Sequence, residues 1–436
     1  MKLKAKNKMG LIFFPAFDWA ISPTHPEREE RLLYTQDQIK EEGLLDIEGI
    51  KEFKPLIATD TQINRAHVCV PDVDTQATIS HRISAGGALK AAKIVMEKKV
   101  DKAFALVRPP GHHARRIVHG NRGFCNINIE AVMIEELRKK YGIKKIAVVD
   151  TDCHHGDGTQ DIYYNDPDVL FISLHQDGRT LYPGSGFPSE FGVGQGYGYT
   201  LNVPLPPHTS DRGYLYVIEN LVLPVLEQFQ PDIVINSAGQ DNHFTDPITN
   251  MNISARGYAK LNEMINPDIA VLEGGYSVEG ALPYTNCGII MAMSGIDYSG
   301  VIEPDYDEDE ISESESIMKR IKQVVQEVWT RWQMRDELRK KHIGNNEILR
   351  FRRSVYYDEA GITEFQNEEI YLCKKCQSFT VIDSEGDYYR ILAFLLSYDI
   401  CEQCKNKAKS LLDKVNKGYY HKIYWHDKSK DEYLTL

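Results

Sequence analysis

The chain has 436 residues, of which 42% are hydrophobic and 26% are charged. This is enough material for two or three domains with a large core. The net charge of −12 argues against binding a phosphate backbone over the whole surface, although a local basic patch is compatible with it. No apolar run reaches the roughly 18–20 residues of a membrane span, so no transmembrane segment is predicted.

Residues 1–21, MKLKAKNKMGLIFFPAFDWAI, superficially resemble a signal peptide because a basic start precedes an apolar run. Pro15 and Asp18 interrupt the apolar part, and no small-residue cleavage site follows it cleanly. We therefore interpret the segment as a first strand.

The eight cysteines fall into two groups. Four are scattered singly, and four form two CxxC pairs, Cys373/Cys376 and Cys401/Cys404. Paired CxxC motifs in a large chain without a signal peptide favour zinc in a reducing compartment over disulfides. We therefore expect a cytoplasmic protein.

Short β-branched runs alternate with helix-like segments over the first 300 residues. The runs are apolar on both faces, which predicts central strands of a parallel sheet covered by helices. Amphipathic segments at 80–99 and 129–142 supply crossover helices. We predict one α/β domain over residues 1–300, with strands at 102–107, 144–150, 169–175, 231–239 and 267–275.

The composition changes after residue 300. Residues 301–316 include the acidic run EPDYDEDEISESES (303–316), which predicts a solvated linker. Residues 317–350 begin with helical periodicity and carry Trp329 and Trp332, which predicts an amphipathic helix. The CxxC pairs lie in residues 368–436, which we expect to form a small C-terminal module.

Titratable side chains follow four of the predicted strands. In an open α/β sheet, ligands bind just beyond the carboxyl ends of the strands. His112 and His113 follow the first of these strands, DTDCHHGDGTQ (150–160) the second, Asp241 and Asp246 the third, and Tyr276 the fourth. We expect these groups to gather at one edge of the sheet, a convergence that packing alone does not explain.

Asp152, His154 and Asp241 have the side chains of a metal site. One nitrogen and two carboxylates suit Zn²⁺ or Fe²⁺ with open positions for water and substrate. A single His or Asp in such a loop is more often a cap or a satisfied loop residue, but the set together favours a metal centre.

The adjacent His112 and His113 do not easily point at one metal. They suit acid–base chemistry, for which each imidazole needs a carboxylate to fix its tautomer. Asp150 and Asp157 are available for this role.

The motifs around these residues resemble those of the histone deacetylase superfamily, which includes deacetylase-like amidohydrolases and acetylpolyamine amidohydrolases. They occur in the family's order over about the first 290 residues, a specific set. The matching segments are THPEREERL (24–32), AGGAL (85–89), RPPGHHA (108–114), GFCNIN (123–128), DTDCHHGDGTQ (150–160), SLHQ (173–176), YPGSG (182–186), NVPLPP (202–207), GQDNHFTDP (239–247) and LEGGYS (272–277).

The resemblance implies an arginase–deacetylase α/β fold, with a central parallel sheet flanked by helices, and zinc-dependent hydrolysis of N-acyl amides. It implies that Asp152, His154 and Asp241 bind the catalytic zinc. It assigns His113 as the general base and later the general acid, His112 as its electrostatic partner, and Asp157 and Asp150 as the carboxylates behind them. It assigns Tyr276 as the phenol that donates to the substrate carbonyl and then to the tetrahedral oxyanion.

The resemblance also implies a potassium ion beside the zinc and an acyl-lysine tunnel. The side chains of Asp150 and Ser173 and the carbonyls of Asp152, His154 and Leu174 match the potassium site. Gly123, Phe124, Tyr182 and Gly275 match the tunnel, with Tyr182 where phenylalanine is usual. Ile248 matches a gate position that is acidic in a polyamine-specific branch, which argues against that branch's substrates. A rim aspartate is expected in VPDVDT, as Asp72 or Asp74.

The pairs CKKC and CEQC predict a structural zinc site at Cys373, Cys376, Cys401 and Cys404 rather than redox dithiols. Between them, FTVIDSEGDYYRILAFLL is typical of strand, turn and strand, and KNKAKSLLDKV after them is typical of a helix. This zinc-ribbon-like module is either a scaffold or a binding site for a protein partner. The lysines at 405–417 fit a solvated helix face better than nucleic-acid binding.

Three functions are compatible with these patterns. The first is a zinc deacylase acting on acyl-lysine in proteins or on a small acylated amine, acetylpolyamines included. The second is a two-manganese ureohydrolase, which would need a second set of ligands where His112 and His113 stand. The third is a non-catalytic binding module, against which the complete set of ligands, base and tyrosine argues. The natural acyl group, the amine and the oligomeric state stay open.

Overall fold

The computed structural model describes residues 3–17 and 19–436, so Asp18 lies outside the described residues. Its largest sheet has eight strands in the order β2-β1-β4-β10-β9-β6-β7-β8, and every neighbouring pair is parallel. The strands are β1 (Lys4–Phe14), β2 (Glu48–Phe53), β4 (Lys102–Val107), β6 (Ile146–Asp150), β7 (Val169–Gln176), β8 (Thr200–Leu205), β9 (Ile233–Ala238) and β10 (Ile269–Leu272).

The parallel sheet confirms the predicted strands, including the first one. Alternate residues of β4 enter two different hydrophobic cores: Phe104 and Leu106 on one face, Ala105 and Val107 on the other. Both faces are therefore buried, which is why these strands are apolar throughout. The edge strand β2 was not predicted, because its exposed residues break the apolar pattern.

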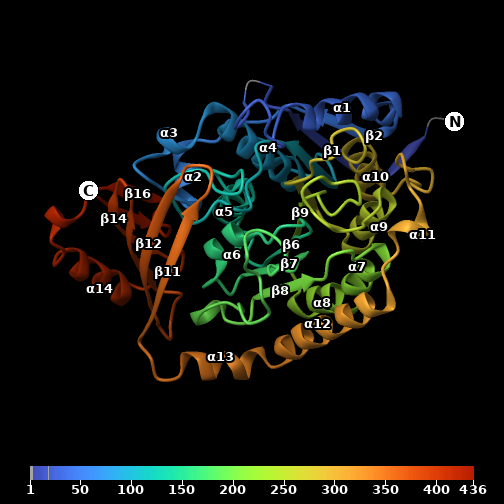
Figure 1. Cartoon of the computed structure of the whole chain (residues 1–436). Helices are drawn as coiled ribbons and strands as arrows, with labels where there is room; N and C mark the ends of the chain where they lie inside the picture. Colours follow the sequence, from blue (N-terminus) through green and yellow to red (C-terminus); the bar gives the residue numbers. More distant parts are fainter. Residues whose placement is uncertain (1–2, 18) are drawn as a thin grey trace.

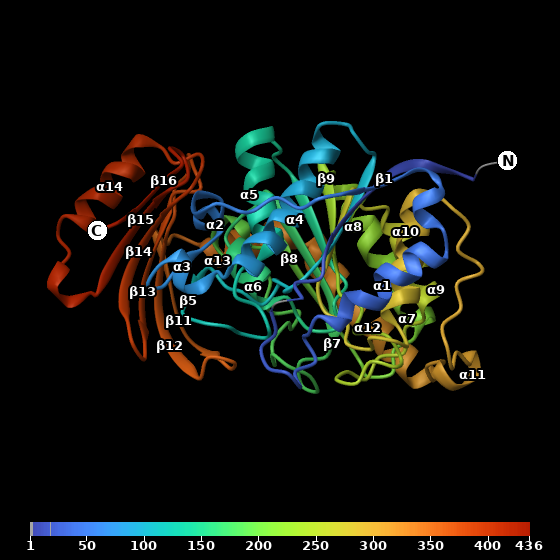
Figure 2. The same ribbon diagram turned by 90° about the horizontal axis from the view of Figure 1, so that it is seen from above.

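Helices cover both faces of the sheet, as Figures 1 and 2 show. One core lies under α2 (Asp60–Ala66), α4 (Ile79–Met96) and α5 (Ile129–Tyr141), and the last two confirm the predicted crossover helices. The other core lies under α1 (Glu30–Glu41), α7 (Asp211–Val217), a π-helical segment (Ile218–Val222), α8 (Leu223–Phe229), α9 (Ala255–Ile265) and α10 (Leu282–Ser294).

Smaller elements lie in the loops between the strands. They are α3 (Val73–Gln76), α6 (Asp157–Tyr163), 3-10 turns at Leu44–Asp46, Gly194–Gly196 and Lys417–Tyr419, and a two-stranded parallel ribbon of β3 (Val68–Cys69) and β5 (Ile117–Val118). None of the helices in the described ranges is long and apolar enough to cross a membrane.

The acidic segment is not solvated throughout, which corrects the expected linker. It contains α11 (Glu308–Ile311), and both Glu303 and Glu313 are buried. Glu313 accepts from the backbone N–H of Ser210 at 2.8 Å, and Glu303 from that of Ala255 at 2.9 Å. These N–H groups lie at the starts of α7 and α9, where donors lack partners within the helix and attract negative charge. The acidic composition of the segment could not indicate that Glu303 and Glu313 bind the starts of two helices distant in sequence.

The predicted amphipathic helix is present but divided. It consists of α12 (Glu315–Gln333) and α13 (Arg335–Ile343), which meet at Met334. Trp332 is fully buried against the eight-stranded domain and its indole N–H donates to Gln228 Oε1 at 2.9 Å. A strand begins at Ile348, so the last residues of the interval 317–350, which was expected to be helical, form a β-strand instead.

The C-terminal residues form a six-stranded sheet at one end of the molecule (Figure 1). Its strands, in sheet order, are β11 (Ile348–Tyr357), β12 (Ile362–Tyr371), β13 (Phe379–Gly386), β14 (Arg390–Leu396), β15 (Lys422–Asp427) and β16 (Glu432–Thr435). The predicted strand–turn–strand between the CxxC pairs is β13–β14, and the predicted helix after them is α14 (Glu402–Leu412). The sheet starts at Ile348, earlier than the 368 expected for the module.

The C-terminal sheet lies between α14 and the α/β domain (Figure 2). One face packs on α14 through residues such as Phe394 and Ala408. On the other face, Ile382 and Tyr424 form a hydrophobic cluster with Val68 and Ile117 of the β3–β5 ribbon. The contact is therefore apolar and buried, and it joins the C-terminal sheet firmly to the first domain.

Candidate active site

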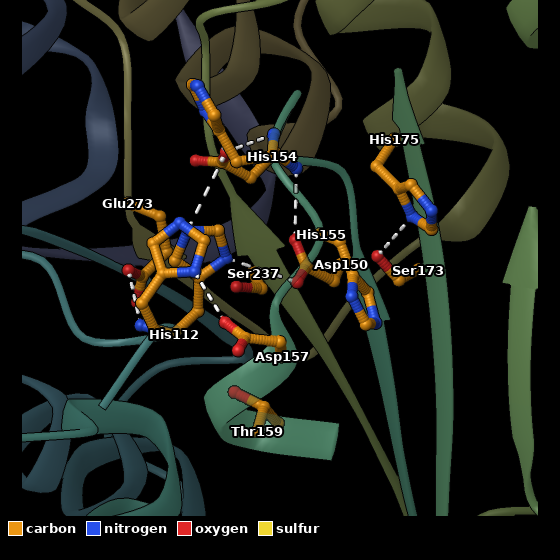
Figure 3. Close-up of polar contacts among 12 residues, drawn as sticks. His112, Asp150, His154, His155, Asp157, Thr159, Ser173, His175, Ser237 and Glu273 are labelled. Atoms are coloured by element: carbon orange, nitrogen blue, oxygen red, sulfur yellow. Dashed lines mark hydrogen bonds and ion pairs between the residues drawn. The ribbon is translucent and has the colours of Figure 1, made fainter. Parts of the chain in front are cut away.

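The titratable residues predicted to converge come from four strands that are neighbours in the sheet, β4, β10, β9 and β6. Their carboxyl ends lie at one edge because all four run in the same direction. Figure 3 shows Asp150, His154 and Asp157 around the end of β6 and the start of α6, beside His112 from the β4 loop.

Asp152, His154 and Asp241 form a compact buried cluster whose ligand atoms all lie within 4.8 Å of one another. His154 Nδ1 lies 2.8 Å from Asp241 Oδ2 and 3.3 Å from Asp152 Oδ1. The backbone N–H of Gly274 donates to Asp152 Oδ2 at 2.7 Å, and that of Cys153 donates to Asp241 Oδ1 at 2.7 Å. These outer bonds orient both carboxylates, as supporting residues do in metal sites.

The charges of this cluster favour a cation. Burial would lower the pKa of His154, but Asp241 and Asp152 raise it to about 10. Burial would raise the pKa of Asp152, but His112 and His154 hold it well below its usual range. Burial and the neighbouring Asp152 raise the pKa of Asp241. Two buried carboxylates thus share one imidazole, a donor set that suits Zn²⁺.

The two adjacent histidines each have a carboxylate. His113 Nδ1 donates to Asp157 Oδ1 at 2.8 Å, and His112 Nδ1 lies 3.3 Å from Asp150 Oδ2. Burial, followed by the charge on His112, lowers the pKa of His113 to about 3. Burial also disfavours charge on His112, but Asp152 and Asp150 raise its pKa well above the usual value. The environment therefore separates the pair into a neutral proton acceptor and a charged partner.

Tyr276 is buried beside the cluster and is fixed on both sides. Its backbone N–H donates to Asp246 Oδ2 at 2.8 Å, and the Arg31 guanidinium lies 4.9 Å from its ring centre. Gly274 and Gly275 allow the backbone before Tyr276 to lie close to the ligand cluster. A Cβ at Gly274 would collide with the carboxylates of the ligand cluster, and Gly275 has a φ of 119°, which favours glycine.

The aromatic residues expected to line the substrate site flank the same cluster. The Tyr182 ring lies 5.2 Å from the ring of His113 and 6.4 Å from that of His154, between centres. The Phe124 ring packs edge-on against Tyr276 at 5.6 Å. The preceding Gly123 has a φ of 53°.

The expected gate and rim residues lie in loops. Ile248 is half-buried, and its N–H donates to Asp246 Oδ1 at 3.1 Å. Asp72 caps α3 by accepting from the Thr75 N–H at 2.9 Å, and Asp74 pairs with Arg82 at 2.7 Å. These contacts do not distinguish Asp72 from Asp74 as the rim residue, which stays a prediction.

The residues matched to potassium lie on adjacent strands. Asp150 of β6 and Ser173 of β7 are register partners, and Figure 3 shows Ser173 bonded to His175. Ser173 Oγ lies 2.9 Å from His175 Nδ1, and the Leu174 carbonyl accepts from the Tyr214 hydroxyl at 3.2 Å. The potassium site itself stays a prediction.

Several charged residues around the histidine pair were not predicted from the sequence. Glu273 Oε2 accepts from the N–H of Gly111 at 2.7 Å and of His112 at 2.9 Å, so it holds the histidine loop in place. Glu273 lies in the LEGG motif. Its charge, directly after an otherwise apolar strand, could have indicated a role at the site.

A row of ion pairs connects His113 to the C-terminal sheet. Asp157 lies 3.2 Å from Arg115, Arg115 lies 2.9 Å from Asp161, and Asp161 pairs with Arg353 of β11. Arg122 lies 2.7 Å from Asp157 as well. Burial would raise the pKa of Asp157, but Arg122 and His113 hold it well below its usual range, so the partner of His113 stays charged.

The four C-terminal cysteines form a second candidate metal site, with ligand atoms within 4.8 Å of one another. Cys373 and Cys376 lie between β12 and β13, whereas Cys401 and Cys404 lie at the start of α14. The N–H of Lys375 donates to Cys373 Sγ at 3.4 Å, and this bond lowers the pKa of Cys373 to about 7. The cysteines of the described residues are all free thiols, so the cluster is not a pair of disulfides.

The fold and the site together define an α/β protein with a buried histidine–carboxylate metal-ligand cluster beside a histidine pair. Residues 68–286 match the model of the histone deacetylase domain. The chain is 47% identical to a probable deacetylase from Archaeoglobus fulgidus over 311 residues, which is 65% of this chain and 85% of the relative. The chain therefore belongs to the histone deacetylase family.

Two further comparisons agree with this assignment. A histone deacetylase-like amidohydrolase from Pseudomonas aeruginosa is 37% identical over 49% of this chain and 58% of its own length. The crystal structure of the HDA15 HD domain superimposes with a TM-score of 0.65 and 26% identity, covering 78% of this chain and 99% of that one. The predicted arginase–deacetylase fold is confirmed, and the two relatives are described as a probable deacetylase and a histone deacetylase-like amidohydrolase.

Proposed function

We propose that the protein is a zinc-dependent amidohydrolase that removes an acyl group, acetyl in the simplest case, from the amino nitrogen of acyl-lysine or of a small acylated amine. The observation that carries this proposal is the arrangement of His113, held by Asp157, beside the cluster of Asp152, His154 and Asp241. A proton acceptor and a divalent-metal site at one strand edge are what amide hydrolysis requires.

Asp152, His154 and Asp241 would hold the zinc, because one imidazole and two oriented carboxylates leave coordination positions open. When bound, zinc supplies Lewis acidity, which polarises the acyl carbonyl and makes water easier to deprotonate.

His113 accepts the proton of the attacking water, and Asp157 stabilises the imidazolium that results. The same imidazolium then donates its proton to the departing amine. His112, next to Asp150 and Asp152, stays charged and supports negative charge that develops at the reacting centre.

Tyr276 donates a hydrogen bond to the substrate carbonyl oxygen, and this bond strengthens as the oxygen becomes negative. Removing one such donor typically costs about 3 kcal/mol of transition-state stabilisation. Phe124 and Tyr182 hold the acyl-bearing chain between their rings, with Gly123 and Gly275 leaving room beside them.

The test is a hydrolysis assay on acylated lysine peptides and acetylated amines. We expect His113→Ala to lower kcat by about 10³-fold and Tyr276→Phe by about 10²-fold, with zinc content unchanged. The exposed His208→Asn and the half-buried Tyr298→Phe, both outside the site, serve as matched controls and keep wild-type rates. Wild-type turnover in both site variants would refute the assigned roles.

We also propose two further ions. A structural zinc at Cys373, Cys376, Cys401 and Cys404 would tie β12–β13 to α14. A potassium ion beside Asp150 and Ser173, reached by the carbonyls of Asp152, His154 and Leu174, would brace the loop that carries the catalytic ligands. Replacing potassium by choline in the buffer should lower the melting temperature, and an unchanged melting temperature would argue against that ion.

A further inference from the structure

The turn between β11 and β12 in the C-terminal sheet packs against the loop that carries Phe124. The hydroxyl of the buried Tyr357 lies 2.9 Å from the carbonyl oxygen of Ile117 and 2.8 Å from Glu364 Oε2. A side chain at Gly120 would lie only 2.5 Å from Cβ of Ala360. The turn is therefore docked on the first domain rather than extended into solvent.

Asp358, in this turn, joins two sides of the proposed acyl site. Its Oδ1 accepts from the backbone N–H of Gly123 at 3.0 Å and from the hydroxyl of Tyr182 at 3.3 Å. The hydroxyl of Tyr182, at a position where the family usually has phenylalanine, thus has its partner in the C-terminal sheet.

Glu359, the next residue, reaches the aromatic wall by way of His25. Glu359 Oε1 lies 3.5 Å from His25 Nε2, and the His25 ring packs edge-on against Phe124 at 4.3 Å. His25 Nδ1 accepts from the Glu27 N–H at 3.0 Å, so the proton of the neutral ring is on Nε2, facing Glu359.

The two carboxylates leave this end of the site negative. The ion pairs found among residues 3–17 and 19–436 include none with Asp358. Arg122, whose guanidinium lies 5.4 Å from the Tyr182 ring centre, is paired with Asp157 instead. Tyr182 is 37% exposed and His113 only 3%, so the ring of Tyr182, which Asp358 contacts, lies nearer the surface than the histidine.

We propose that the β11–β12 turn is part of the substrate entrance, and that Asp358, rather than the apolar gate residue Ile248, is a specificity-determining residue favouring acylated amines that also carry a positive charge. This inference rests on the proposed hydrolase function. One oxygen of Asp358 holds Gly123 and Tyr182, while the carboxylate charge attracts the cationic end of the substrate. Because Asp358 is half-buried, we expect a preference of about three- to tenfold in kcat/KM.

The test compares three substrates of equal length that differ only at the far end: N-acetylcadaverine, which ends in an ammonium group, N-hexylacetamide, which ends in a methyl group, and 6-acetamidohexanoate, which ends in a carboxylate. We expect kcat/KM to fall in that order for the wild-type chain. Asp358→Asn keeps an oxygen for Gly123 and Tyr182 but removes the charge. It should bring the ratio of cationic to neutral substrate close to one, with the change in KM rather than kcat.

Glu432→Gln, on the exposed edge strand β16 of the same sheet, is the matched control and should keep the wild-type ratio. A pair of acetyl-lysine peptides with lysine or glutamate beside the acetylated residue shows whether a peptide can supply the positive charge. Equal kcat/KM for the three small substrates, or a preference unchanged in Asp358→Asn, would overturn the inference. Loss of hydrolysis of every acylated substrate by the wild-type chain would instead overturn the proposed function, and this inference with it.

Discussion

The two candidate metal sites of this chain differ in donors, burial and surroundings. Asp152, His154 and Asp241 are all buried just beyond the carboxyl ends of β6 and β9 in the eight-stranded sheet, whereas two of the four cysteines are half-buried at the end of the molecule. The first set has three ligands and a histidine pair beside it, and the second has four sulfurs and a hydrophobic cluster beneath it. Three ligands leave room for a substrate, and four close the coordination shell.

The difference between the two sites predicts different roles, one catalytic and one structural. We propose that the three-ligand site next to a proton acceptor carries out the reaction, while the four-cysteine site between strands and a helix holds these elements together. Altering the first should therefore change activity and leave folding intact, and altering the second should do the opposite.

The largest expected effect follows from Asp241→Ala. Removing one of three ligands should eliminate bound zinc at this site and lower the hydrolysis rate by about 10⁴-fold. Zinc content, measured by atomic emission, should fall from about two to about one per chain. Retention of both zincs and of activity would contradict the assignment of this cluster as catalytic.

Cys376→Ser should instead destabilise the C-terminal sheet. Losing the structural zinc should lower the free energy of unfolding by several kcal/mol, about 3 or more, because zinc binding is coupled to folding. Thermal melting of the variant measures this, with Lys374→Ala, an exposed position between the two cysteines of the same pair, as the control. An unchanged melting temperature and zinc content would show that the four thiols hold no metal.

The junction of the two regions should weaken in acid. Burial lowers the pKa of His67 to about 4 and that of His426 to about 3, against about 6.5 in the unfolded chain. Below pH 6.5 the unfolded chain binds more protons than the folded chain. The free energy of unfolding is therefore highest above that pH, and it decreases as the pH falls towards the pKa values of the two histidines in the folded state.

Each of these two histidines should lower the free energy of unfolding by about 2 kcal/mol as the pH falls from 6.5 to 5. Urea unfolding at both pH values measures the loss, and His426→Gln should reduce the pH dependence by the share of one group. The same pH dependence in wild type and variant would show that His426 is not a buried neutral group in the native state.

A smaller effect should link the two regions directly. Arg353→Ala removes the C-terminal end of the ion-pair row that leads by Asp161 and Arg115 to Asp157. We expect kcat to fall by about three- to tenfold because the carboxylate behind His113 is less well fixed. Arg350→Ala, on the same strand but exposed and paired with Glu369, is the control. Equal rates for the two variants would show that the row does not act on His113.

Much of the first domain could be predicted from sequence, because its central strands are buried on both faces and therefore apolar throughout. The ligand cluster was also predictable, since Asp152 and His154 stand in one loop and the carboxyl ends of parallel strands converge. Glu303 and Glu313 could not be predicted as buried, since their partners are backbone groups of helices far away in sequence. Arg353 and Asp358 were missed for the same reason: they act on residues more than a hundred positions away.

The central claim is tested most directly by X-ray diffraction from crystals of the full chain at wavelengths on either side of the zinc absorption edge. We expect an anomalous difference peak between the side chains of Asp152, His154 and Asp241, and a second one between the four cysteine sulfurs. Absence of the first peak from a chain that hydrolyses acylated amines would contradict that claim.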